Sequence, residues 1–170
     1  MLRARLDASL YILPLVRLMV GPVFLFEGVQ KFIYPSIRGT GRFEQMGFPA
    51  PEFFGTLVGS VEIVCGLLIL VGLFTRLAAI PTAGIMIVAI ITTKIPVLLG
   101  HGFGPFEVRD APFYGFLSMV HEMRTDWAML LGSVILILGG AGAGSLDAWR
   151  AQDREASVAS STDASMRSGS

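Results

Sequence analysis

The segment FFGTLVGSVEIVCGLLILVGLF, residues 53–74, decides how this chain folds. It is long enough to cross a hydrocarbon core of about 30 Å as a helix, and it lacks the alternation of a membrane β-strand. Its single charged side chain, Glu62, lies near its centre. An ionised carboxylate at that depth costs about 3 kcal/mol or more unless it finds a partner. The segment therefore predicts a transmembrane helix, and Glu62 marks a candidate functional site within it.

Composition places the whole chain in a membrane. Of its 170 residues, 53% are hydrophobic and 15% are charged, whereas a soluble domain carries about 25% charged residues. The lipid bilayer is therefore the first expected partner. A net charge of zero without a basic cluster argues against nucleic acid as a partner. Cys65 is the one cysteine, so neither a disulfide framework nor a thiolate metal site can be built from this chain.

Three further apolar runs have the length of a membrane span, namely residues 10–33, 77–99 and 127–143. The sequence thus predicts an all-α, polytopic membrane protein, a bundle of four transmembrane helices in one domain over residues 1–148. Arg17 interrupts the first run and no convincing cleavage site follows it, so we interpret this run as a retained span and not as a signal peptide. A Ser- and Ala-rich polar tail, residues 149–170, is expected to be disordered.

The connections and the termini complete the predicted topology. Residues 34–52 predict an ordered loop with short turns. Residues 100–126 form an aromatic connection, in which residues 111–120 are too short to span and predict an interfacial or re-entrant segment. An even number of spans places both termini on one side. That side carries five arginines (Arg3, Arg5, Arg76, Arg150 and Arg154) and the other side four, which favours cytoplasmic termini.

Helix phase and depth bring polar side chains of different spans together. At 100° per residue, glycines share a face with Lys31 on the first span and with Glu62 on the second. Small residues at four-residue spacing let helices approach closely, so these two faces are expected to pack against each other. A rise of about 1.5 Å per residue then places Glu27, Lys31, Glu62 and Lys94 in the half of the bundle away from the termini.

We therefore predict a polar pocket that opens away from the termini and is roofed by the aromatic connection. Its candidate binding residues, or buried polar network, are Arg17, Glu27, Gln30, Lys31, Glu62 and Lys94. The candidates from the connection itself are His101, Asp110 and His121. No metal site is expected, because the two histidines lack a third ligand at helical spacing. The buried charges also have a purely structural interpretation, in which they only fix the register of the helices.

Several short motifs occur in a characteristic order: Arg17-Leu18 with Gly21, FEGVQKF at residues 26–32, Gly59 and Glu62 with Gly66, Leu67, Gly72, Leu73, Thr75 and Arg76, and GAGSLD at residues 142–147. In these motifs the chain resembles the DoxX family of small four-helix membrane proteins, over roughly residues 12–148. The resemblance implies the cytoplasmic membrane of a prokaryote. It also implies relatives such as the membrane subunit of a thiosulfate:quinone oxidoreductase. Related redox proteins carry paired cysteines, so with Cys65 alone any electron transfer here requires a quinone or the cofactor of a redox partner subunit.

Two functions remain open at this point. The first is the membrane subunit of an oxidoreductase system, in which Glu62 and Glu27 exchange protons while Lys31 and Lys94 stabilise the negative charge of a quinone or small anion. The second is a non-enzymatic structural or assembly protein. Transport of a small solute would need the symmetry of a homo-oligomer, since no inverted repeat is evident among the four spans. Whether the chain is itself an enzyme is not decided by its sequence.

Overall fold

The structure is a computed structural model that describes the backbone of residues 2–153 and the side chains of residues 11–153. Within this part of the chain the regular elements are helices, and the β-structure consists of one isolated bridge between Phe103 and Phe106. The helices in chain order are α1 (Leu2–Ile33), α2 (Thr40–Gln45), α3 (Pro51–Val71), α4 (Thr75–Ala89), the π-helix η1 (Ile90–Lys94), α5 (Ile95–Leu99) and α6 (Phe116–Gly139).

Three helical segments are long and apolar enough to cross a membrane, namely Tyr11–Ile33, Pro51–Val71 and Thr75–Leu99. They confirm three of the predicted spans to within a few residues. The fourth predicted span, residues 127–143, lies in the second half of α6 and in the glycine-rich turn that follows it. Glu122 and Asp126 occupy the first half of this helix, so its apolar part is shorter than that of the other three. The number of four spans therefore remains a prediction.

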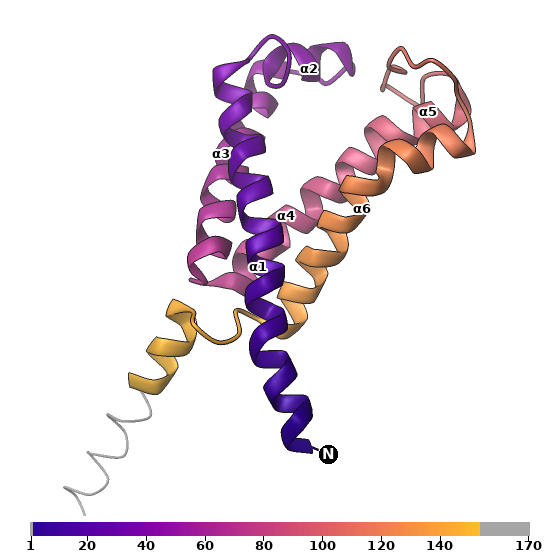
Figure 1. Ribbon diagram of the computed structural model, residues 1–170. Coiled ribbons are helices and arrows are strands. Elements are labelled where there is room, and N and C mark those ends of the chain that lie inside the picture. Colours follow the sequence, from indigo (N-terminus) through magenta and orange to yellow (C-terminus); the bar gives the residue numbers. More distant parts are fainter. Residues whose placement is uncertain (1, 154–170) are drawn as a thin grey trace, which may run out of the picture.

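The helices form two pairs that diverge from a common end (Figure 1). The first pair is α1 with α3, and the second is α6 with the continuous rod of α4, η1 and α5. The pairs meet where α3 turns into α4, and they separate toward α2 and α5. This divergence leaves room for a cavity at the wide end.

Glycines bring α1 and α3 into close contact, as the sequence predicted. A Cβ atom added at Gly28 would lie 2.7 Å from the carbonyl oxygen of Gly59, and one added at Gly21 would lie 3.0 Å from that of Gly66. Neither distance leaves room for a side chain. The two glycine-lined faces therefore pack backbone against backbone, which fixes the register of Lys31 and Glu62 relative to each other.

A buried arginine closes the narrow end of the molecule. Arg17 donates hydrogen bonds to the carbonyl oxygens of Ile69, Leu70 and Ala141, at 3.0, 2.8 and 3.2 Å. Ile69 and Leu70 belong to the last turn of α3, where carbonyl oxygens lack the next turn of helix as a donor, and Ile69 O also accepts a hydrogen bond from the amide of Gly72. Asp147 accepts hydrogen bonds from the amides of Phe74 and Thr75 at the start of α4. This end is therefore stabilised by two side chains that hydrogen-bond the backbone groups at the end of α3 and at the start of α4.

The first connection contains α2, which agrees with the predicted ordered loop. The structure differs from the prediction at residues 111–120 and in the first part of the polar tail. The segment at residues 111–120 is not a separate element, however, because α6 already begins at Phe116 after Gly115, whose φ of +108° ends the preceding loop. Residues 146–153 are helical, and the remainder of the predicted polar tail lies outside the described residues.

Candidate functional site

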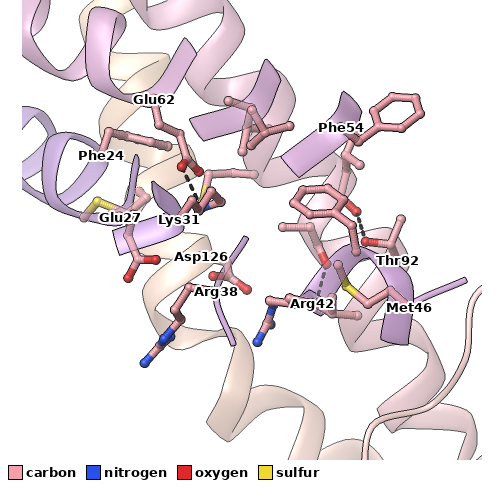
Figure 2. Close-up of a pocket in the computed structure, with 18 of the residues that line it drawn as sticks. Phe24, Glu27, Lys31, Arg38, Arg42, Met46, Phe54, Glu62, Thr92 and Asp126 are labelled. Atoms are coloured by element: carbon pink, nitrogen blue, oxygen red, sulfur yellow. Dashed lines mark hydrogen bonds and ion pairs between the residues drawn. The ribbon is translucent and has the colours of Figure 1, made fainter. Parts of the chain in front are cut away.

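A cavity of about 590 Å³ occupies the space between the two helix pairs at their wide end (Figure 2). Pockets that bind organic ligands commonly measure roughly 300–1,000 Å³. Its walls are largely apolar and come from α1, α2, α3, α4, η1 and α6. The ionisable side chains that line it are Glu27, Lys31, Arg38, Arg42, Glu62, Lys94, Arg109 and Asp126. It thus combines the volume and the apolar lining of a ligand site with an excess of positive charge.

An ion pair between α1 and α3 forms the deep end of the cavity. Lys31 Nζ lies 2.6 Å from Glu62 Oε2, and the two side chains are 12% and 3% exposed. The ammonium group of Lys31 therefore compensates a carboxylate that would otherwise be costly at this depth.

The π-helix η1 places a second cation on the opposite wall. Its wider turn contains one residue more than an α-helix, a distortion that is frequent at functional sites. Thr92 and Thr93 stabilise it by donating hydrogen bonds to carbonyl oxygens one turn earlier. Lys94 is the last residue of η1. Its Nζ atom lies 3.2 Å from Asp126 Oδ2 and 3.8 Å from Glu122 Oε2, both on α6. Each pair of helices is therefore joined by its own ion pair.

Three arginines converge at the mouth of the cavity from two connections that are distant in sequence. Arg38 and Arg42 come from the segment around α2, and Arg109 comes from the connection that precedes α6. Burial lowers the pKa of the Arg42 guanidinium from its ordinary value, and the positive charges of Arg109 and Arg38 lower it further. Arginine nevertheless stays protonated in proteins. Figure 2 shows Arg38 and Arg42 beyond Lys31, at the end of the cavity away from Glu62.

The roof of the cavity comes mainly from the first connection and not, as predicted, from the aromatic third one. Phe43 of α2, Phe48 and Phe54 pack ring against ring, with centroids 5.2 and 5.5 Å apart. Phe106 of the third connection adds one ring to this cluster, 5.1 Å from Phe48. The prediction was wrong because the aromatic residues near Phe113 lie on exposed surface.

The structure brings together four of the six predicted network residues, since Glu27, Lys31, Glu62 and Lys94 all line the cavity. Arg17 is buried, but it lies at the narrow end and binds helix carbonyls there. Gln30 is half-buried and lies outside the cavity lining.

The candidates of the third connection lie outside this lining as well. His101, Asp110 and His121 are exposed. His101 contacts the carbonyl oxygen of its neighbour Gly102. No group of three or more His, Cys, Asp or Glu side chains in the described part of the chain is placed to hold a metal ion.

Four ionisable residues of the cavity lining were not among the sequence candidates: Arg38, Arg42, Arg109 and Asp126. Asp126 had a recognisable signal, because it follows Glu122 by four residues and so shares its helix face. The arginines had none, since their convergence depends on how two connections fold against each other.

Comparisons with known proteins agree with this architecture. A family model named DoxX matches residues 12–95. The chain is 51% identical to "Uncharacterized membrane protein Rv3486" of Mycobacterium tuberculosis (strain ATCC 25618 / H37Rv) over 132 residues, which cover 78% of this chain and 77% of that protein. It is 30% identical to "Putative oxidoreductase CatD" of Bacillus subtilis (strain 168) over 127 residues, 74% of this chain and 77% of that one. No solved structure matches it. The chain is a membrane protein that belongs to the DoxX family.

Proposed function

We propose that this chain is the membrane subunit of an oxidoreductase system and that the deep end of its cavity holds a quinone or a small anion. The observation that carries the proposal is the buried ion pair of Lys31 and Glu62, both of which line a cavity with largely apolar walls. The name of the Bacillus subtilis relative, which is 30% identical, supports an oxidoreductase connection. The apolar walls suit the ring of a quinone, and the polar groups at the deep end suit its oxygens.

The chain's own residues supply proton transfer and charge compensation. A bound quinone takes up two electrons and two protons when it is reduced to a quinol. The electrons come from the donor of a partner subunit, since a single cysteine provides no dithiol. The carboxyl groups of Glu62 and Glu27, which both line the cavity, each pass on one of the two protons, and the ammonium group of Lys31 stabilises the ionised Glu62 carboxylate 2.6 Å away. With a small anion as ligand, Lys31 and Lys94 act as the cationic groups.

We place the protein in the cytoplasmic membrane of a prokaryote, with four spans and both termini in the cytoplasm. Both relatives named above are bacterial. The apolar half of α6 packs along α4 and would cross the membrane beside it. Protease protection of a C-terminal tag in spheroplasts and in inverted vesicles tests this orientation. A tag accessible in intact spheroplasts would contradict it.

The test of the site removes the ion pair without leaving an unpaired charge. The double variant Lys31→Met/Glu62→Leu replaces a buried ion pair by apolar groups, a change that is often neutral for stability. A matched control is Thr82→Val/Ser133→Ala, which removes a buried 3.0 Å hydrogen bond between α4 and α6 away from the cavity. We expect the first variant to lose about tenfold or more in affinity for a short-chain quinone in nanodiscs, and the control to bind normally. Equal binding by both variants would overturn the proposal.

One observation favours a structural role instead. Each ion pair joins helices of the same pair, Lys31 of α1 with Glu62 of α3, and Lys94 of η1 with Asp126 of α6. Such pairs could serve to fix register alone. Under that alternative the double variant changes thermal stability but not the binding of quinone or of inorganic anions, so the same experiment separates the two functions.

A further inference from the structure

The mouth of the cavity carries positive charge that the protein leaves largely unpaired. Among the described residues, neither Arg38 nor Arg42 forms an ion pair, and Arg109 pairs with Glu122 through one nitrogen, 2.8 Å away. The positive charges of Arg109 and Arg38 lower the pKa of Arg42, and the carboxylates of Glu27 and Asp126 offset this only through space, without an ion pair. Like charges held together in this way are stabilised by an anion that bridges them, and guanidinium groups match phosphate and carboxylate oxygens in geometry.

The cavity also opens sideways, toward the surroundings of the helices. On α3, Leu57 lines the cavity and is 44% exposed, and on α4 Val88 lines it and is 48% exposed. Gly84 lines it one turn deeper and is exposed, and a Cβ atom added there would meet nothing within 4 Å. From the helical rise, Val88 and Gly84 lie about 16 and 22 Å along the rod from Leu99. This opening between α3 and α4 therefore faces the hydrocarbon region, and its rim is apolar.

Between α1 and α6 the cavity lining is polar. Glu27 of α1 with Thr125 and Asp126 of α6 line it there, and Asp126 lies beside Arg38 (Figure 2). Polar groups suit water or a small polar ligand and not an acyl chain. The apolar side opening and the cationic mouth thus lie on one path, which runs from the membrane interface into the lipid between α3 and α4.

From these features we infer that the cavity binds an anionic phospholipid, with its phosphate on Arg38, Arg42 and Arg109 and an acyl chain leaving between α3 and α4. A basic pocket between membrane helices is a recognised setting for an anionic lipid head group. A free oxyanion shares the phosphate chemistry, but it would use neither the volume of about 590 Å³ nor the apolar opening. The phosphate position lies in the same cavity, at the end away from Glu62 (Figure 2), and the inference does not rest on the function proposed for Glu62.

The experiment measures lipid retention by the full chain. The protein is reconstituted in nanodiscs of phosphatidylcholine with a minor fraction of phosphatidylglycerol, and bound lipid is identified by native mass spectrometry. We expect phosphatidylglycerol to be enriched over phosphatidylcholine. Arg42→Gln should reduce the enrichment about tenfold, the effect of removing one charge-assisted hydrogen bond. The matched control is Arg124→Gln, which changes an exposed arginine outside the cavity and should leave the enrichment unchanged.

A second pair of variants tests the path of the acyl chain. Gly84→Leu adds a side chain at the side opening, where a Cβ atom meets nothing within 4 Å, and should reduce lipid retention while leaving the binding of inorganic phosphate unchanged. Ala128→Leu adds the same side chain at an exposed position of α6 outside the cavity and should have no effect. If Arg42→Gln does not fold, Arg38→Gln replaces it.

Three outcomes would overturn the inference. Equal retention of both lipids would show no anionic site, and equal retention by Arg42→Gln and Arg124→Gln would show no role for the arginines. Displacement of phosphatidylglycerol by inorganic phosphate at comparable concentration would show a small-anion site only. None of these results depends on quinone binding, which is measured with the Lys31/Glu62 variant.

Discussion

Lys31 Nζ and Glu62 Oε2 lie 2.6 Å apart at the deep end of the cavity, where glycine contacts hold α1 and α3 together. The pair therefore has two possible effects, one on the stability of the helix pair and one on the ligand. Separate measurements on the same variants distinguish them.

Removing one partner of this pair should destabilise the protein more than removing both. Glu62→Leu leaves the ammonium group of Lys31 uncompensated in an apolar setting, which costs about 3 kcal/mol or more. The double variant with Lys31→Met should recover most of that loss. Unfolding in mixed detergent micelles measures both quantities. Additive effects of the two single substitutions would mean that the two groups do not interact.

Asp147→Ala should weaken the junction between α3 and α4. The carboxylate accepts hydrogen bonds from the amides of Phe74 and Thr75, at 2.8 and 3.0 Å, where α4 begins. Loss of such a cap costs about 1–2 kcal/mol. The thermal midpoint in detergent should fall accordingly. Asp153→Ala changes an exposed aspartate and serves as the control, and an equal fall in both variants would argue against the cap.

The close approach of α1 and α3 predicts a sharp difference between two glycines. A Cβ atom at Gly66 would lie 2.5 Å from the backbone nitrogen of Leu25, whereas one at Gly84 would meet nothing within 4 Å. Gly66→Ala should therefore destabilise the protein by about 1–3 kcal/mol, the usual cost of overpacking. Gly84→Ala should be neutral or slightly stabilising, because alanine favours a helix. Similar stabilities for the two variants, measured by unfolding in detergent, would contradict the packing described here.

Arg17→Lys should lower stability without changing ligand binding. The guanidinium group reaches three carbonyl oxygens at once, which an ammonium group on a different stem cannot reproduce. We expect a loss of about 2 kcal/mol in unfolding free energy. Arg124→Lys is the exposed control. A fall in quinone or lipid binding, with stability unchanged, would instead place Arg17 in the site.

Much of this fold follows from local properties of the chain. The length of each apolar run predicts three of the helices, because the thickness of a bilayer sets a minimum length for a span. The glycine spacing predicts which faces of α1 and α3 meet, because a helix repeats every 3.6 residues whatever surrounds it. The depth of each residue along its span, from the helical rise, placed Glu27, Lys31, Glu62 and Lys94 in the same half of the bundle.

The partners within the pocket depended on tertiary structure. The π-helix η1 turns Lys94 toward Asp126 and Glu122, and a distortion of one residue has no reliable local signal. Arg17 shares a helix face with Lys31, but the packing of α1 on α3 places carbonyl oxygens of the last turn of α3 within its reach at the narrow end.

The sequence by itself determined that this is a helical membrane protein with charges buried at a cost, and that Glu62 is the deepest of them. Only the tertiary structure decided which cation neutralises which carboxylate, and that Arg38, Arg42 and Arg109 share one cavity mouth. The physical reason is the separation along the chain over which each effect acts. Hydrophobic run length and helix phase act between near neighbours in the chain, whereas ion pairing and the shape of the cavity depend on how two diverging helix pairs and their connections pack together.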